Sequence, residues 1–413
     1  MPALSRRHAL TFVLITVLID TIGLGIIMPV TPGLIRDLTG EGLSEAAVYG
    51  GWLAFVFAVM QFLSAPVLGN LSDRFGRRPV LLLSLAVLGV DYIIMGLAPT
   101  LAWLFVGRAL AGIAGASYTP AYAYVADISP PERRAHNFGL IGAAFGGGFI
   151  IGPAIGGLLG EFGPRVPFFV AASLSLLNVI YGYFVLPESL PPDLRRRFEW
   201  KRSNPLGTLL QMRKQSTIMG LLSVLFLWEL ATQVFPSIWP FYTMYRFNWS
   251  VAAVGWSLAF IGAIFAISQV MTGAVVARLG ERRATTLGIA FGIIGYIGYT
   301  LASQGWMMYV WLSTWLVAGF VMPAVTAILS HRVSSDAQGE LQGAIACCYS
   351  LAAILGPPLM TQLFGRFSGE SAPIHFPGAP FLCAMLLSVG CLLLFRRTLN
   401  NNASQLAANE RQG

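Results

Sequence analysis

Apolar residues recur along the chain in long runs that short polar segments separate. A helix rises 1.5 Å per residue, so about 20 apolar residues cross the ~30 Å hydrocarbon core of a bilayer. Twelve runs are long enough, and their ends are defined to within about two to four residues. They predict helices over residues 9–31, 47–70, 79–98, 101–124, 137–160, 167–186, 216–240, 252–275, 284–302, 305–330, 340–364 and 378–396. The pattern therefore predicts an all-α membrane protein.

Composition excludes a soluble protein. Of the 413 residues, 56% are hydrophobic and 11% are charged, whereas about 25% of the residues in soluble domains are charged. The first apolar run follows Arg6, Arg7 and His8, as the core of a signal peptide would. However, this run is longer than such a core, lacks a small-residue cleavage site and contains Asp20. We therefore expect the first helix to be retained.

Basic residues are distributed unequally between the two sides of the predicted membrane. If the N-terminus is cytoplasmic, 21 of the 26 Lys and Arg residues fall in cytoplasmic segments, and the outer loops hold only Arg36, Arg165, Arg246 and Arg366. This positive-inside bias predicts a multi-pass inner-membrane protein with both termini in the cytoplasm. The net charge of +8 then follows from membrane orientation, and no nucleic-acid partner is expected.

Sequence features recur at an offset of 204 residues. The offset relates Gly69 to Gly273, Arg74 to Arg278, Gly76 to Gly280, and Gly152-Pro153 to Gly356-Pro357. Six helices duplicated in the same orientation are typical of secondary transporters built from two bundles. We therefore predict an N-terminal bundle at 1–186, a cytoplasmic linker at 187–215, a C-terminal bundle at 216–397 and a disordered cytoplasmic tail at 398–413.

The polar stretch GNLSDRFGRRPV, Gly69 to Val80, interrupts two apolar runs and predicts a tight cytoplasmic turn. Asp73 lies at the carboxyl end of the second helix, where the helix dipole disfavours an anion. It therefore needs a nearby Arg or the amino end of another helix as a partner. If the contact with this partner forms only while the cytoplasmic face of the transporter is closed, the turn acts as a gate. The alternative is that its charges only anchor the topology. The gating residues expected here are Gly69, Asp73, Arg74, Gly76, Arg77 and Arg78.

Glycines spaced four apart mark the fifth predicted helix. Gly148, Gly152 and Gly156 share one face and permit close approach of a neighbouring backbone. Gly157 adjoins this face, and Pro153 permits a kink. Packing that slides or bends suits a helix that moves during transport, although ordinary small-residue packing explains the same pattern.

Four ionisable residues fall inside predicted spans, where charges are costly and usually functional. They are Asp20, Asp91, Arg108 and Glu229. A carboxyl group in an apolar setting can bind a proton on one side of the membrane and release it on the other. Asp20 is the first proton-coupling candidate, because it lies near the bilayer midplane. Asp91 and Glu229 follow, and Arg108 could hold a released carboxylate. A permanent structural ion pair is the alternative.

Polar and aromatic residues in the spans are candidates for binding a substrate. Ligand sites are mostly apolar with a few polar groups. The amides of Gln61, Gln233 and Gln269 would supply polar contacts, and Tyr118, Tyr122 and Trp228 would supply flat apolar walls. Simple packing is the competing interpretation for these aromatic residues.

Several of these motifs resemble those of a known family. GNLSDRFGRRPV is similar to the signature loop of the major facilitator superfamily, GRALAGIAGA (107–116) to its fourth-helix Arg motif, and GGGFIIGPAIGGLLGE (146–161) to its antiporter motif. LIDTIGLGIIMPVTPGL and LGERRATTLG resemble the tetracycline efflux group. The resemblance implies drug:proton antiport and places Asp20, Asp91 and Arg108 at charged positions of those pumps. Those pumps carry His and Asp where this chain has Phe265 and Gly292.

These features favour a proton-coupled antiporter that exports amphipathic small molecules by alternating access. A symporter or uniporter for a small metabolite is the alternative, which the fifth-helix glycines disfavour. The sequence has no Walker-type loop, metal-ligand cluster or signalling domain, so neither an enzyme nor a receptor is expected. We expect no metal or other cofactor, a proton gradient as the energy source, and a monomer in the lipid bilayer. Tetracycline itself remains one candidate substrate among others.

Overall fold

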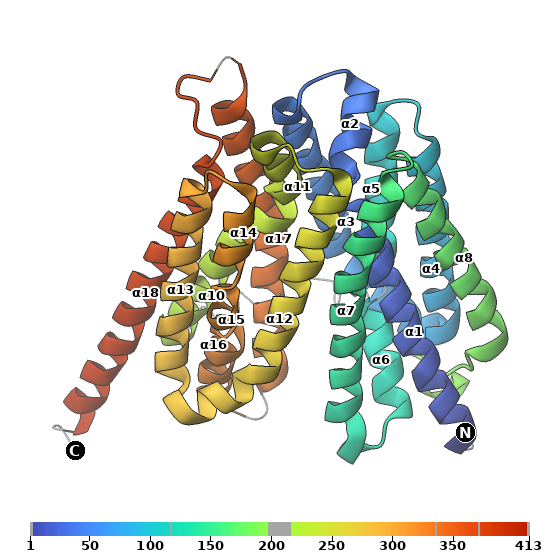
Figure 1. Ribbon diagram of the computed structural model, residues 1–413. Coiled ribbons are helices and arrows are strands. Elements are labelled where there is room, and N and C mark those ends of the chain that lie inside the picture. Colours follow the sequence, from blue (N-terminus) through green and yellow to red (C-terminus); the bar gives the residue numbers. More distant parts are fainter. Residues whose placement is uncertain (1–2, 116–117, 197–215, 335–336, 371, 411–413) are drawn as a thin grey trace. The chain divides into compact units, whose positions relative to one another are not determined.

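The computed structural model describes residues 3–115, 118–196, 216–334, 337–370 and 372–410, and its regular elements are helices (Figure 1). Within these residues, 12 helical segments are long and apolar enough to cross a bilayer. The predicted all-α membrane fold is therefore confirmed. The runs were identifiable because about 20 predominantly apolar residues are needed to cross the hydrocarbon core of a bilayer.

The first half contains α1 (Ala3–Ile27), α2 (Thr31–Thr39), α3 (Leu43–Phe75), α4 (Arg77–Leu97), α5 (Leu101–Gly115), α6 (Tyr118–Ile128), α7 (Pro131–Gly160), α8 (Val166–Val185) and the 3-10 turn η1 (Pro192–Leu194). The second half contains α10 (Ser216–Thr232), α11 (Val234–Phe247), α12 (Val251–Leu279), α13 (Glu281–Leu301), α14 (Gly305–Leu312), α15 (Trp315–Ala318), α16 (Val321–Ser330), α17 (Gln338–Ser368) and α18 (Ala379–Glu410).

The chain divides into two compact units. The first comprises Met1–Asn204 with Thr243–Gly262, and the second comprises Pro205–Tyr242 with Ala263–Gly413. The start of α12 thus belongs to the first unit. Most of the predicted linker, residues 197–215, lies outside the described residues. Helix α18 continues to Glu410, through most of the range for which the sequence predicted a disordered tail.

The polar turn between α3 and α4 is shorter than the sequence predicted. Helix α3 runs through Asp73 to Phe75, and α4 begins at Arg77, so only Gly76 separates them. Its φ of 103° is accessible to glycine and strained for other residues. At the equivalent repeat position, Gly280 has a φ of 76° and separates α12 from α13. The helices extend beyond the apolar runs because charged residues outside lipid still make helical backbone hydrogen bonds.

The core of the first unit forms between α1, α4 and α6. Phe12, Val17, Leu85 and Tyr124 are all buried in one cluster. Tyr124 also donates a hydrogen bond of 2.9 Å from its hydroxyl to the carbonyl oxygen of Pro187. This bond fixes the end of α6 to the segment that follows α8.

Candidate functional site

Asp91 and Arg108 form an ion pair inside the first unit. Arg108 Nη2 lies 3.3 Å from Asp91 Oδ2, and the Asp91 side chain is fully buried. The guanidinium also donates to Met95 Sδ over 2.9 Å and lies 5.7 Å from the Phe57 ring centroid. A Cβ at Gly107 would lie 2.6 Å from Asp91 Oδ1, so this glycine lets α5 approach α4 closely. The pair places two compensating charges in an apolar interior.

Asp20 is buried in α1 without such compensation. Its side chain is 7% exposed, and Oδ1 has no hydrogen-bonding partner among the described residues. An ionised carboxylate left unpaired in an apolar interior costs several kcal/mol. Within the described residues, no ion pair or hydrogen bond joins Asp20 to Asp91 or Arg108, so the first unit contains two separate ionisable sites.

Glu229 lies half-buried near the end of α10, beside a break in the seventh span. Its carbonyl oxygen accepts hydrogen bonds from Thr232 Oγ1 over 2.9 Å and from the backbone N–H of Gln233 over 3.2 Å. The Gln233 side chain packs on Gly356, where a Cβ would lie 2.5 Å from Gln233 Cγ. Gln233 is thus held between α10 and α11 against the backbone of α17.

Trp228 lies inside the second unit. Its side chain is 1% exposed, and its ring centroid lies 5.9 Å from that of Trp315. A Cβ at Gly292 would lie 2.6 Å from Trp228 Cη2. The indole therefore occupies the space that a side chain at position 292 would need. Phe265, the other position that departs from the resemblance, is 46% exposed.

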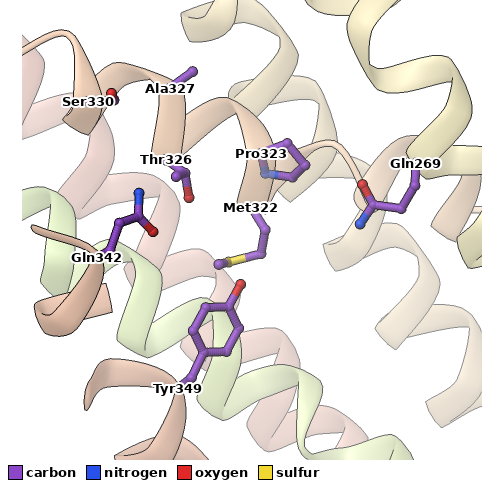
Figure 2. Close-up of a pocket in the computed structure, with 8 residues that line it drawn as sticks. All are labelled: Gln269, Met322, Pro323, Thr326, Ala327, Ser330, Gln342 and Tyr349. Atoms are coloured by element: carbon purple, nitrogen blue, oxygen red, sulfur yellow. The ribbon is translucent and has the colours of Figure 1, made fainter. Parts of the chain in front are cut away.

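A pocket of about 480 Å³ opens within the second unit (Figure 2). Gln269 of α12, Gln342 and Tyr349 of α17, and Thr326 of α16 supply hydrogen-bonding groups, and Met322 adds a polarisable apolar surface. None of the eight side chains that line it is charged. Of the six residues suggested for substrate binding, only Gln269 lines this pocket.

The remaining suggested residues lie elsewhere. Gln61 Nε2 donates to the carbonyl oxygen of Gly115 over 3.2 Å, within the first unit. Tyr122 is 42% exposed, with its ring centroid 5.7 Å from that of Phe138. Tyr118 begins α6, and its side chain lies outside the described part of the chain.

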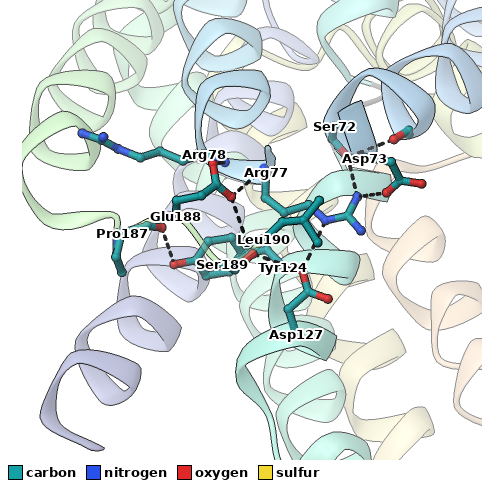
Figure 3. Close-up of polar contacts among 11 residues, drawn as sticks. Ser72, Asp73, Arg77, Arg78, Tyr124, Asp127, Pro187, Glu188, Ser189 and Leu190 are labelled. Carbon is teal, nitrogen blue, oxygen red and sulfur yellow. Dashed lines mark hydrogen bonds and ion pairs between the residues drawn. The ribbon is translucent and has the colours of Figure 1, made fainter. Parts of the chain in front are cut away.

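Arg77 is the centre of a polar network at the junction of α3 and α4 (Figure 3). Its Nη1 lies 2.5 Å from Asp73 Oδ1, and its Nε lies 3.3 Å from Asp127 Oδ2 at the end of α6. It also donates to Ser72 Oγ over 2.6 Å. The partner that Asp73 requires is therefore an arginine one turn away.

Glu188, which follows α8, caps the amino end of α4 (Figure 3). Its carboxylate accepts the backbone N–H groups of Arg77 and Arg78 over 2.8 and 3.3 Å. An anion at a helix amino end is stabilised by the dipole and the free N–H groups. A Cβ at Gly76 would collide with this carboxylate. Gly76 is thus required both for its φ and for the space that Glu188 occupies.

Arg78, Arg74 and Gly69 of the same motif each contact a different neighbouring residue. Arg78 Nη2 donates to the carbonyl oxygen of Tyr183 over 2.6 Å. Arg74 is exposed, with its guanidinium 5.0 Å from the Phe75 ring centroid. A Cβ at Gly69 would lie 3.5 Å from Thr119 Cγ2, an ordinary contact.

The glycines of α7 face two helices. Cβ atoms at Gly148 and Gly152 would lie 2.8 and 2.6 Å from the carbonyl oxygens of Leu18 and Ile22 in α1, and one at Gly156 would collide with Ile26. A Cβ at Gly157 would instead lie 3.0 Å from Gly255 Cα at the start of α12. The Pro153 ring packs over Gly25, where a Cβ would lie 2.6 Å from Pro153 Cδ. Helix α7 therefore lies against the backbone of α1 on one face and against the backbone at the start of α12 on another.

Sequence reasoning missed Glu188, Asp127 and the pocket residues Gln342 and Tyr349. Two signals were present. Asp127 ends the fourth span as Asp73 ends the second, and Glu188 follows an apolar run directly, with no basic residue beside it. The pocket residues carried no local signal, because only folding brings α12, α16 and α17 together.

Within the described residues, twelve apolar helical segments, a buried ion pair, a buried carboxyl group and an uncharged polar pocket are features typical of a multi-pass membrane transporter. The family model described as Major Facilitator Superfamily matches residues 13–357. The chain belongs to this family, as its motifs predicted.

Curated relatives are similar over nearly the whole chain. The class C tetracycline resistance protein of Escherichia coli is 40% identical over 395 residues, 95% of this chain and 98% of that protein. The class G protein of Vibrio anguillarum is 37% identical, over 95% and 98% of the two chains. The crystal structure of the human organic anion transporter MFSD10 has a TM-score of 0.70 at 23% identity, covering 96% of this chain and 100% of that one. This last similarity concerns the fold alone.

Proposed function

We propose that this protein is a proton-coupled antiporter that exports amphipathic small molecules across a bacterial inner membrane, with both termini in the cytoplasm. Its similarity to tetracycline resistance proteins supports drug efflux. The observation that carries the coupling is the carboxyl group of Asp20, which is buried in a span and whose Oδ1 has no hydrogen-bonding partner in the described part of the chain. Such a group is readily neutralised by a proton, and a conformation that admits water releases that proton.

The other ionisable residues have different roles in this proposal. Arg108 compensates the charge of Asp91, so the pair keeps a fixed arrangement as the unit moves. Glu229 is the second proton-coupling carboxyl group, because it lies beside the helix break at Gln233. The gradient supplies the energy, so the cycle requires no cofactor.

The substrate is held in part by uncharged groups of the second unit. Gln269, Gln342 and Tyr349 offer hydrogen bonds, and Met322 offers an adaptable apolar contact. Substrates recognised here carry hydrogen-bonding groups on an apolar framework and need no countercharge from the pocket.

Purified protein in proteoliposomes with an internal pH dye tests this proposal. Candidate substrates, tetracycline among them, are added on the side from which they are exported. The proposal expects proton movement opposite to each transported substrate, and its loss in the variants Asp20→Asn and Glu229→Gln. The control is Asp37→Asn, an exposed acid in α2. Proton movement in the same direction as the substrate would identify a symporter, and gradient-independent transport would identify a uniporter.

A further inference from the structure

A second pocket of the first unit is an apolar groove of about 520 Å³ formed by α3, α4 and α5. Leu71 and Phe75 of α3, Leu83 and Val87 of α4, and Ile113 of α5 line it, and Ser84 supplies the one polar side chain among its lining residues. Phe75 is 51% exposed and Leu83 is 66% exposed, so the groove opens outward. These helices are membrane spans, so an apolar groove on the surface of the first unit suits an acyl chain.

A single basic side chain lies at the charged end of this groove. Arg77 and Arg78 are engaged by carboxylates and a carbonyl oxygen, whereas Arg74 makes no ion pair within the described residues. Arg74 is exposed, and its guanidinium lies 5.0 Å from the ring of Phe75, which lines the groove. The groove is therefore apolar, and at its rim lies the Arg74 guanidinium, which makes no ion pair within the described residues.

The charges around this rim favour an anion. Asp73, Asp127 and Glu188 balance Arg74, Arg77 and Arg78. One further arginine side chain lies beside them, since Arg195 Nη2 lies 3.1 Å from the Cβ position of Gly76. These four arginines and three carboxylates together carry a net charge of +1. An apolar chain joined to an anionic head group has the matching chemistry.

We propose that this groove, with Arg74 at its rim, binds an acyl chain of an anionic phospholipid whose phosphate contacts the Arg74 guanidinium. Guanidinium groups bind phosphate through paired hydrogen bonds. A basic residue near an anionic leaflet contributes about 1 kcal/mol, which corresponds to a roughly fivefold preference for the anionic lipid.

Native mass spectrometry of the full-length protein tests this inference. Phosphatidylglycerol and phosphatidylethanolamine with identical acyl chains are titrated against the wild type and three variants. Arg74→Gln removes the rim cation, and Leu83→Trp fills the groove with apolar bulk. The control is Arg278→Gln, which changes the exposed arginine at the repeat-equivalent end of α12.

The proposal expects the wild type and Arg278→Gln to prefer phosphatidylglycerol about fivefold. Arg74→Gln is expected to lose that preference, and Leu83→Trp to weaken the binding of both lipids. The proposal would be overturned if the two arginine variants lost the preference for phosphatidylglycerol equally, or if neither variant lost it. Full lipid binding by a Leu83→Trp protein with a wild-type melting temperature would overturn it too, as would a protein dimer that occupies the groove in place of lipid.

Discussion

The indole of Trp228 lies against the backbone of Gly292, where a Cβ would come within 2.6 Å of Trp228 Cη2. Because Trp228 is almost completely buried, the indole has little room to move away. Gly292→Ala is therefore expected to destabilise the second unit by about 1–3 kcal/mol, the usual cost of overpacking. Thermal unfolding in detergent measures the effect.

The matched control for this variant is Gly390→Ala in α18, where a Cβ would meet nothing within 4 Å. It is expected to unfold at or above the wild-type temperature. Trp228→Phe, a smaller side chain, should restore part of the stability of Gly292→Ala. Equal melting temperatures for the two alanine variants would contradict the close packing of Trp228 and Gly292.

Alanine variants of the repeat-equivalent glycines Gly76 and Gly280 allow the cost of backbone strain to be measured separately from the cost of steric crowding. Both combine a positive φ with an extended ψ, a region that is essentially restricted to glycine, so alanine at either position costs about 1–3 kcal/mol in strain. Only Gly76 faces a neighbour, the Glu188 carboxylate, whereas a Cβ at Gly280 would meet nothing within 4 Å. Gly76→Ala should lower the melting temperature more than Gly280→Ala. Equal decreases would mean that Glu188 is easily displaced.

The sequence was sufficient to predict the twelve spans and the repeat. Each span must be predominantly apolar. The offset of 204 residues relates Gly76 to Gly280, which share a positive φ and a place between two helices. The helix ends were less predictable, since charged residues such as Asp73 remain helical outside the apolar core.

The long-range partners were less accessible to sequence reasoning. Nothing local indicates that Glu188 caps a helix that begins 111 residues earlier. The place of Trp228 inside the second unit depends on glycine at position 292, which leaves room for the indole. The four ionisable residues within the spans could be identified, since charges within an apolar run are conspicuous. Which of them form an ion pair depends on how α4 and α5 pack against each other.

The contact of α7 with α1 depends on the absence of side chains at particular positions. Gly152→Ala places a methyl group 2.6 Å from the Ile22 carbonyl oxygen, so we expect a loss of about 1–3 kcal/mol and slower transport. Gly146→Ala, in the same helix with nothing within 4 Å, should gain up to about 1 kcal/mol from helix propensity. Melting temperatures and initial transport rates measure both. Faster transport by Gly152→Ala would argue against this tight contact.

The Asp91–Arg108 pair is suited to a double-mutant cycle. Removing one partner leaves a buried charge uncompensated, so Asp91→Asn and Arg108→Gln are each expected to cost about 3–5 kcal/mol. The double variant should cost less than the sum of the two, because no unpaired charge remains. Unfolding temperatures of the four proteins give the coupling. If the losses of stability in the two single variants add up to the loss in the double variant, the interaction between Asp91 and Arg108 does not contribute to stability.

The proton-carrying role of Asp20 is tested most directly by comparing substrate exchange with net transport in Asp20→Asn proteoliposomes. An amide imitates the neutral carboxyl group and cannot release a proton. The account predicts that exchange of labelled for unlabelled substrate continues near the wild-type rate, while accumulation driven by a pH gradient is abolished. Accumulation at the wild-type level would contradict a proton carried by Asp20, and loss of both activities would show that Asp20 serves binding or structure instead.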